Sequence, residues 1–490
     1  MNRRQFLGSS LAAAQFSPMS PLPEPAPLGS GFLFLDESRL AASQGAHLVP
    51  PPLAKLGLLL SGDLPGDAAG AQSAMGCGLF RIPGGYRLYY SGRSREEPVS
   101  GICVAESPDA LHWRKPLLGQ LKLGGRDTNR IRIEGVPDYA HVTQPSMLQL
   151  PDGRFRMYFW LHEYRELKRK RYLVAESRDG LLWKTVNLDR PCLVHLHDPG
   201  AATQFKRIRS NDAVHTYALP GGGFEMFSVF PVPNTPATGR YIAHDNAPFM
   251  LRVITRRTSE DGLEFSDPEF IAVPDARDPW DQQFYYLTQH RFGPLRIGFL
   301  GHYRVQEQSM DIELAYSHDG SRWSRPMRGA WLERGPAGES DSAMVYMPNQ
   351  LIDAGDHWLA LYSGSPALHN QPQQGKRGIH GLKIAKQRFA ALASTASVTA
   401  SLLTKPFYLS GPSLDLNASV SGSLRAELCN AFGQPMEGLS LADSIPVSGD
   451  SVHHDLRWKN KSTADHQSQP VSLRLEWRRA DLYAIQQSQR

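Results

Sequence analysis

The sequence predicts an all-β protein in which a five-bladed β-propeller is followed by a small antiparallel β-sandwich. Three observations predict this fold class. A short strand motif recurs five times at nearly constant spacing, and a hairpin turn with a following aromatic residue recurs with it in four of the five copies. After about residue 400 the pattern changes to longer alternating strands. Helical periodicity is nearly absent, and sheets that repeat in this way close into a ring around a central channel.

The repeated motif alternates aromatic and aliphatic residues after a Gly-rich or Asp-Gly turn. Its copies start 69, 69, 71 and 63 residues apart. A second strand follows each copy and another precedes it, which gives about four strands in each unit of about 70 residues. The copies are Tyr86–Tyr90, Phe155–Phe159, Phe224–Ser228, Leu295–Phe299 and Trp358–Tyr362.

Four units continue into a turn that ends in an aromatic residue. An Asp-Gly pair between two strands is typical of a hairpin, and the aspartate of such a turn accepts local backbone hydrogen bonds. We therefore expect structural roles for these aspartates and packing between blades for the aromatic residues. The fifth unit lacks the turn, so another strand must complete its sheet, and Phe32–Leu35 is the candidate. The aspartates are Asp109, Asp179, Asp261 and Asp319, and the aromatic residues are Trp113, Trp183, Phe265 and Trp323.

The sequence divides into three segments. Residues 1–30 contain adjacent arginines before Phe6-Leu7 and a short apolar stretch, which resembles a twin-arginine export signal, followed by a Pro-rich linker. The propeller is expected over 31–400 and the sandwich over 401–490. We expect export to the periplasm or the cell exterior and no membrane span after removal of the signal. The alternative is an N-terminus without a targeting role.

Composition and motifs exclude several classes of function. The 490 residues carry a net charge of +5, with no dense Lys/Arg stripe of the kind that binds nucleic acid. The four cysteines, Cys77, Cys103, Cys192 and Cys429, form no C-x-x-C pair, which argues against a zinc knuckle or redox dithiol. The sequence contains no P-loop, H-E-x-x-H or G-x-S-x-G motif, so nucleotide hydrolysis, zinc proteolysis and serine-hydrolase chemistry have no support.

Three stretches carry a resemblance to a known group of enzymes. Asp281–Tyr285, Ile297–Leu300 and Ile312–Gly320 resemble the propellers of glycoside hydrolase families 32 and 43. Glu339–Val345 and the tail from Leu414 to Tyr483 are similar to exported family 32-like relatives. The resemblance covers roughly residues 30–490, and it implies a carbohydrate-active enzyme that acts on an oligo- or polysaccharide. The Asn-Asp-Pro-Asn type motif of the first blade of invertases has no counterpart here.

Polar clusters precede the inner strands of the blades and are expected to converge near the channel axis. Carboxylates gathered there would push one another's pKa values apart, as acid/base hydrolysis of a glycosidic bond requires. We expect Asp212 and Asp281 to share the base and pKa-setting roles and Glu339 or Glu163 to be the acid. The alternative is a polar, water-filled channel without catalysis. The candidate catalytic residues are Asp212, Asp281, Glu339, Asp341 and Glu163.

Loops on the same face add aromatic and charged groups that could bind sugars, since aromatic rings stack on sugar rings and polar groups bind hydroxyls. Glu163 has an alternative role in a salt bridge with Arg165 or Lys168. The candidate substrate-binding residues are Gln144, Arg209, Asn211, Gln282, Trp160, His162, His302 and Arg304.

No metal or cofactor is needed for this chemistry. Asp212, Asp281 and Asp341 offer the hard oxygen ligands that suit calcium, and they form a candidate structural calcium site without EF-hand spacing. The function predicted is glycoside hydrolysis in the propeller funnel. The alternatives are a non-catalytic carbohydrate-binding propeller and, with less support, a protein-binding scaffold. The sandwich is expected to buttress the propeller, with glycan binding as its alternative role.

Overall fold

The computed structural model describes residues 19–21, 31–72, 78–95, 99–165, 168–234, 242–371, 375–395, 397–467 and 469–488. The twin-arginine-like segment and most of the Pro-rich linker lie outside these ranges. The described residues form β-strands joined by turns and a few 3₁₀ segments, and they contain no α-helix. No helix within them has the length and apolarity needed to cross a membrane.

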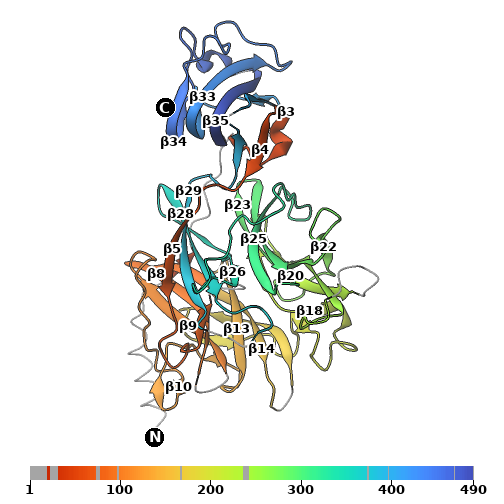
Figure 1. Ribbon diagram of the computed structural model, residues 1–490. Coiled ribbons are helices and arrows are strands. Elements are labelled where there is room, and N and C mark those ends of the chain that lie inside the picture. Colours follow the sequence, from red (N-terminus) through yellow and green to blue (C-terminus); the bar gives the residue numbers. More distant parts are fainter. Residues whose placement is uncertain are drawn as a thin grey trace.

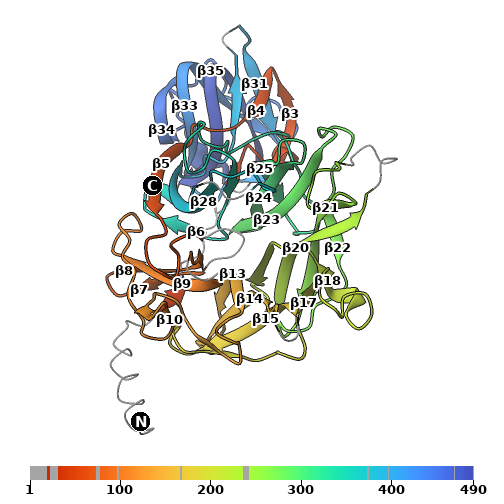
Figure 2. The same ribbon diagram turned by 60° about the horizontal axis from the view of Figure 1, so that its bottom comes forward.

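Five blades surround a central channel, which confirms the predicted fold class (Figures 1 and 2). In each blade an inner strand lines the channel, two antiparallel strands follow, and a short strand or bridge forms the outer edge. The first three blades are β6 (Gly70–Gln72), β7 (Gly78–Ile82), β8 (Gly85–Arg93) and β9 (Ser100–Ser107); β13 (His141–Gln149), β14 (Phe155–His162), β15 (Lys170–Ser177) and β16 (Trp183–Thr185); and β19 (Val214–Ala218), β20 (Phe224–Pro233), β21 (Met250–Ser259) and β22 (Glu269–Ala272).

The last two blades share one hydrogen-bonded sheet through a single parallel pair, Met310 with Met344. Blade 4 contains β23 (Gln282–Phe292), β24 (Leu295–Arg304) and β25 (Ser309–Ser317), and blade 5 contains β26 (Met344–Tyr346), β27 (Leu351–Asp353), β28 (His357–Ser365), β29 (Gly378–Ala385) and β5 (Ala54–Leu60). The repeated motif of the sequence forms the second strand of every blade, namely β8, β14, β20, β24 and β28.

The prediction that Phe32–Leu35 closes the ring is wrong. The outer strand of blade 5 is β5, which pairs antiparallel with β29, and Lys55 anchors it through an ion pair with Asp341 at 2.9 Å. The short strand β2 (Phe32–Leu33) pairs instead with the C-terminal strand β35 (Pro470–Ser488). The physical reason is backbone pairing: β5 hydrogen-bonds along the open edge of β29, whereas Phe32 and Leu33 are already paired with β35.

The four hairpin turns, three with Asp-Gly and one with Asp109-Ala110, are structural, as expected. In all four, the aspartate Oδ1 accepts hydrogen bonds from the backbone N–H groups two and three residues further along. A serine two residues earlier donates to the same oxygen. Burial tends to raise the pKa of Asp261, but these bonds lower it below its usual range, and they also lower the pKa of Asp319. The pKa of Asp109 is lowered most by a hydrogen bond with the His112 side chain and next by the backbone bonds.

The aromatic residue of each turn packs against the preceding blade. Trp183 contacts Tyr89 edge to face with ring centroids 6.2 Å apart, and Trp323 contacts Phe227 at 6.1 Å. The Tyr89 hydroxyl also donates to the backbone oxygen of Gly180. Gly180 has a φ of 75°, and a Cβ there would lie 2.6 Å from the Tyr89 hydroxyl. Both the left-handed backbone and the close contact with Tyr89 therefore require glycine. One local motif therefore shapes the hairpin and joins neighbouring blades.

The C-terminal sandwich is built on two long strands, β33 (Ser413–Asn430) and β35, which pair along most of their length. Irregular pairing after Val420 bends the pair, and Arg479 takes a left-handed φ of 50° near the bend. The two halves of β35 then pair with different strands, so one sheet folds over on itself. The remaining strands are β3 (Leu40–Gln44), β4 (Ala46–Val49), β30 (Ala391–Ser394), β31 (Ala400–Thr404), β32 (Phe407–Tyr408) and β34 (Val447–Asp455).

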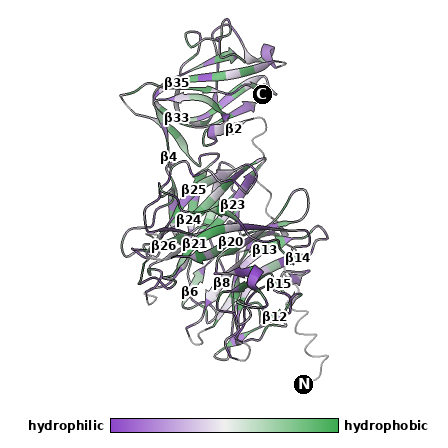
Figure 3. Cartoon of the chain, turned by 90° about the vertical axis from the view of Figure 1, so that its right-hand side faces the viewer, coloured by the Kyte–Doolittle hydropathy of each residue, from purple (hydrophilic) through white to green (hydrophobic). Residues whose placement is uncertain are grey.

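N-terminal strands complete the sandwich, since β2, β3 and β4 all join its sheet (Figure 1). The sequence placed residues 32–49 in the propeller segment, 31–400, but their strands belong to the sheet of the sandwich. Leu33 and Leu35 also belong to the apolar core of blades 4 and 5, together with Ala484 of β35. This shared core attaches the sandwich to the propeller, and in Figure 3 hydrophobic residues, in green, lie along propeller strands such as β20 and β21.

Candidate functional site at the mouth of the propeller channel

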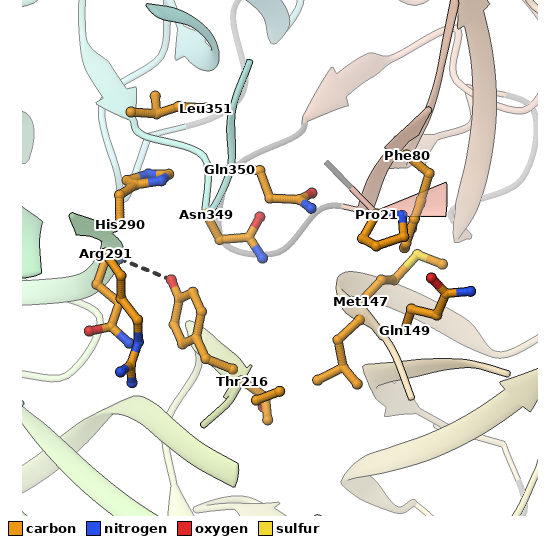
Figure 4. Close-up of a pocket in the computed structure, with 14 residues that line it drawn as sticks. Pro21, Phe80, Met147, Gln149, Thr216, His290, Arg291, Asn349, Gln350 and Leu351 are labelled. Carbon is orange, nitrogen blue, oxygen red and sulfur yellow. Dashed lines mark hydrogen bonds between the residues drawn. The ribbon is translucent and has the colours of Figure 1, made fainter. Parts of the chain in front are cut away.

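Two cavities lie at opposite ends of the channel. The starts of the inner strands line one of about 310 Å³, and their ends line another of about 570 Å³. Figure 4 shows the larger cavity, where β1 (Ser20–Pro21) pairs with β7 and brings Pro21 to the wall.

The larger cavity offers little acid/base chemistry. None of the described residues that line it carries a carboxylate. Burial lowers the pKa of His290 to about 3, so its imidazole is neutral at physiological pH. Arg291 is engaged by Glu225 at 2.5 Å. We therefore consider the cavity of about 310 Å³ the candidate site.

Asp212 is the one carboxylate among the described residues that line the smaller cavity. It lies in the short connection between β18 (Arg209–Ser210) and β19. Its backbone oxygen accepts a hydrogen bond from the buried indole of Trp160 at 3.2 Å. Its carboxyl accepts from Gln144 Nε2 at 2.5 Å and lies 3.4 Å from the Tyr285 hydroxyl oxygen. Neighbouring blades therefore hold this side chain in place.

Burial raises the pKa of Asp212 above its ordinary value of 3.8. The hydrogen bond from Gln144 and the positive charge of Arg252 act in the opposite direction, as do Tyr285 and Arg377. Removal of the charged form from water outweighs them because no cation forms an ion pair with this carboxyl among the described residues. The group thus retains a proton at higher pH than an exposed aspartate does.

Gln144 is held in an unusual conformation at the cavity floor. It sits at a bulge in β13 with a φ of 57°, a left-handed value that costs a non-glycine residue on the order of 1 kcal/mol. Its backbone N–H donates to Ser91 Oγ of blade 1 at 2.8 Å. Its side-chain Oε1 is buried and has no partner among the described residues. The bulge places the amide Nε2 against Asp212 and leaves the Oε1 atom without a partner among the described residues.

A chain of hydrogen bonds runs back from Asp212 into the protein. Tyr285 Oη lies 2.8 Å from His369 Nε2, and His369 Nδ1 lies 3.0 Å from Tyr303 Oη. Tyr303 donates to Asp245, which is ion-paired with Arg252 at 2.8 Å. Because Tyr303 gives its proton to Asp245, His369 Nδ1 is the donor toward Tyr303 and Nε2 is the acceptor for Tyr285. Burial lowers the pKa of His369 to about 3, so the ring is neutral.

The wall from blades 1 and 5 carries the positive charge. Arg93 and Arg377 both line the cavity, as does Gln72. Arg377 Nη1 donates to Gln72 Oε1 at 3.2 Å. Tyr346 and Asn246 complete the polar and aromatic lining.

The other predicted carboxylates do not line this cavity. Asp281 is buried in an ion pair with Arg304 at 2.7 Å and accepts the backbone N–H of Gln306. Asp341 is bound by Lys55 and by the Tyr362 hydroxyl at 2.8 Å. An ion pair satisfies each charge where it sits, so neither is left to converge with Asp212.

The two candidate acids are also elsewhere. Glu339 is exposed on a turn before β26. Glu163 is buried, and its Oε1 accepts the backbone N–H of Arg165 at 2.6 Å. The three aspartates proposed for calcium do not come together, and the described residues contain no group of His, Cys, Asp or Glu side chains placed to hold a metal ion.

Of the predicted binding residues, only Gln144 lines the cavity and Trp160 supports it. His162 does not line it, and its Nδ1 lies 3.0 Å from the hydroxyl of Tyr164. Burial, and next the charge of Asp212, raise the pKa of Tyr164, so this wall is near the site. Asn211 is half-buried and precedes Asp212 in the chain. The other four predicted binding residues make their contacts away from the cavity lining. Arg209 contacts Lys206, Gln282 contacts Gln283, Arg304 pairs with Asp281, and His302 lies opposite Phe284 in the sheet.

Sequence reasoning missed Tyr285, His369, Arg377 and Asn246. Tyr285 could have been found, because it alternates with Gln283 on the inner strand whose polar start was noted. His369 and Arg377 lie in the connection between β28 and β29, on the same face as the other second-to-third strand loops. Their place in the chain gives no signal of the cavity, since the contacts that bring them there span whole blades.

No protein-family model matches the sequence, and no curated protein matches it. Among solved structures, one described as a glycoside hydrolase is 15% identical, with 68% of this chain and 92% of that chain covered and a TM-score of 0.47. A thermostable family-43 glycoside hydrolase is 14% identical over 66% and 91%, with a TM-score of 0.43. An N-acetylgalactosamine deacetylase from F. plautii, in complex with blood group B trisaccharide, is 13% identical over 76% and 96%, with a TM-score of 0.39. These similarities are low, and nothing about activity follows from them.

Proposed function

We propose that the protein is a glycan-acting hydrolase in which Asp212 is the general acid. The observation that carries the proposal is a buried carboxyl with a raised pKa at the floor of a polar channel mouth. A general acid must hold a proton at working pH and release it to the leaving oxygen, and burial prepares a carboxyl for this role.

The hydrogen bonds around Asp212 support proton donation. Tyr285 has one hydroxyl proton, and its contact with His369 is shorter than its contact with Asp212, at 2.8 Å against 3.4 Å. With that proton given to His369, the Tyr285 oxygen accepts rather than competes. A protonated Asp212 can then donate to Tyr285 or to a glycosidic oxygen in the cavity. Tyr285 and His369 would thereby position the acid.

The surroundings also suit a sugar. Tyr285, Tyr346 and the nearby Tyr164 present aromatic rings, and Gln144, Gln72 and Asn246 present amides that can bind hydroxyls. A cavity of about 310 Å³ is at the lower end of the size range of ligand pockets and would hold one or two sugar rings.

A second function is favoured by one specific observation. Most glycoside hydrolases use two carboxyl groups, whereas Asp212 is alone among the described lining residues. The second candidate is therefore a carbohydrate-binding propeller that retains glycans without cleaving them.

The test is an assay of a glycan panel with the wild-type protein, Asp212→Asn and Asp109→Asn. Asp109→Asn is the control, because it makes the same chemical change in a turn at the opposite face, where asparagine can keep the turn. For a hydrolase we expect Asp212→Asn to lower kcat/KM by about 10²–10⁴-fold and Asp109→Asn to leave it unchanged. Binding without product release over long incubation would select the second candidate, and equal hydrolysis by all three proteins would reject Asp212 as the acid.

A further inference from the structure

The blade 1 and blade 5 side of the Asp212 cavity contains a guanidinium that no acidic residue of the described ranges neutralises. Among the described residues, Arg377 forms no ion pair, and its one side-chain hydrogen bond is to Gln72 at 3.2 Å. Its charge lowers the pKa of Asp212, so the two groups are near each other, yet they form no salt bridge. An arginine that faces a cavity without a carboxylate partner is typical of a site for an anionic ligand.

Buried hydrogen-bonding atoms without partners lie around the same cavity. Within the described chain, Arg377 Nε and Gln72 Nε2 are donors without an acceptor, and Gln144 Oε1 is an acceptor without a donor. Gln72 and Gln144 are only 9% and 7% exposed. Leaving such atoms unpaired is unfavourable, so the wall of this cavity has hydrogen-bonding capacity that the described residues do not satisfy.

The backbone fixes Arg377 in place. Ala71 N donates to Arg377 O at 3.0 Å, and the neighbouring Gly70 has a φ of 152°. A Cβ on Gly70 would lie 3.2 Å from the Arg377 Cβ, so these two segments of the backbone approach as closely as glycine allows. The guanidinium and the Gln72 amide are thus held side by side, joined by the hydrogen bond from Arg377 Nη1 to Gln72 Oε1.

We infer that the ligand of this cavity is a sugar that carries a carboxylate, such as a uronic acid residue, with the carboxylate bound by Arg377 and Gln72. This inference rests on the proposed function and names its substrate class. The planar fork of a guanidinium matches the two oxygens of a carboxylate. Arg93, on the same wall, adds positive charge, and its field also contributes to lowering the pKa of His141 after burial. Asp212 does not oppose the ligand as strongly as an ordinary aspartate would, because it retains its proton more readily.

Binding is measured by calorimetry with trisaccharides of galacturonic, glucuronic and mannuronic acid, each compared with its methyl ester. The ester keeps the ring and removes the charge. A sulfated neutral trisaccharide distinguishes a carboxylate from another anion. The proteins are the wild type, Arg377→Gln, Arg377→Lys and Arg322→Gln, in which an exposed arginine on the opposite face loses the same charge. Thermal unfolding and circular dichroism establish that each variant is folded.

We expect the wild type to bind at least one uronate about tenfold or more tightly than its ester. Arg377→Gln should remove that preference, Arg377→Lys should keep part of it because the charge remains without the fork, and Arg322→Gln should keep all of it. If Arg377→Gln does not fold, the wild-type comparison of acid with ester still decides.

Equal binding of acids and esters, a preference for the sulfated sugar, or a preference that survives in Arg377→Gln would overturn the inference. In each of those cases the protein still binds glycans, so the proposed function stands. Absence of binding and cleavage for every glycan, charged or neutral, would remove the proposed function together with the inference.

Discussion

Gln144 donates to Asp212 across the boundary between blades 2 and 3, with 2.5 Å between Nε2 and Oδ1. The donor residue occupies a strained left-handed backbone, and the acceptor is a buried acid with a raised pKa. Each is unfavourable for stability in isolation. Both occur at the one place where the channel opens to a polar cavity, which is where strain and shifted pKa values are concentrated in functional sites.

The strain at Gln144 can be measured by comparing Gln144→Gly with Gln144→Ala. Both variants lose the amide, but only glycine adopts a φ of 57° without cost. We expect the glycine variant to have a free energy of unfolding about 1 kcal/mol higher than the alanine variant. Denaturant unfolding provides the measurement. Both variants should lose activity equally, because the hydrogen bond to Asp212 is absent from each.

Gln149 is the matched control, because it lies in the regular part of the same strand opposite Phe155. There the order should reverse, with alanine more stable than glycine by about 0.5–1 kcal/mol. If glycine were less stable than alanine at position 144 as well, the backbone of Gln144 would not be strained.

The sequence was sufficient for the blades because their signals are local. Each Asp-Gly turn satisfies its aspartate within three residues, and each turn aromatic contacts the adjacent blade, so spacing alone predicts the repeat. Ring closure depends instead on contacts between residues far apart in the sequence. Lys55 and Asp341 are 286 residues apart, and no local pattern indicates that β5 rather than Phe32–Leu35 completes blade 5.

The candidate site was predictable only in part. Polar residues before apolar strands correctly pointed to the channel mouth, which contains Gln144 and Asp212. The same pattern also selected Asp281 and Asp341, since alternation does not reveal that Arg304 and Lys55 neutralise them. An ionised carboxylate near the axis is stabilised most by the nearest cation, and that choice depends on side-chain geometry across strands.

Asp212→Asn should stabilise the protein at neutral pH. The folded state holds the Asp212 proton more tightly than the unfolded chain does, so wild-type stability falls as pH rises from 3.8 through the raised pKa of the folded state. Asparagine has no such dependence. The variant should therefore exceed the wild type at pH 7 by about 1.4 kcal/mol for each unit by which the pKa is raised, and the gain should vanish toward pH 3.8. Urea unfolding between pH 4 and pH 7 measures it.

A contrasting variant is Asp281→Asn, which leaves Arg304 without its partner and should destabilise the protein. A gain from both substitutions, or a gain from Asp212→Asn that does not depend on pH, would contradict the assignment of Asp212 as a buried acid with a raised pKa.

The pH dependence of hydrolysis should show the ionisation of one carboxyl. If Asp212 is the general acid, kcat/KM falls as pH rises through its raised pKa, because the protonated form is the active one. No step is expected near 6.5 from the histidine of the described cavity lining, since burial lowers the pKa of His369 to about 3. Initial rates between pH 3.5 and pH 8 measure the profile. A step near 6.5 would implicate a histidine, and a rate that rises with pH would make Asp212 a base.

Asp245→Asn should be strongly destabilising, because the side chains of Asp245 and Arg252 are each only 1% exposed. The variant leaves the guanidinium buried without its counter-charge, which costs about 3–5 kcal/mol. Burial tends to raise the pKa of Asp245, but Arg252 lowers it below 3.8, so the stability that the pair contributes is present above 3.8 and is lost as pH falls through the lowered pKa. The loss should therefore be full at pH 7 and smaller in acid.

The matched reference is Asp267→Asn, whose ion pair with Arg207 has side chains 61% and 79% exposed, and we expect little or no change in stability there because water screens the pair. A double variant, Asp245→Asn with Arg252→Gln, removes the unpaired charge and should recover part of the loss, as measured by denaturant unfolding at pH 7. Equal costs for the buried and exposed pairs, or no recovery in the double variant, would mean that the charge of Arg252 is neutralised in another way.

Because Tyr303 joins Asp245 to His369 and Tyr285, the same comparison also tests whether this ion pair holds the hydrogen-bond chain behind Asp212 in place.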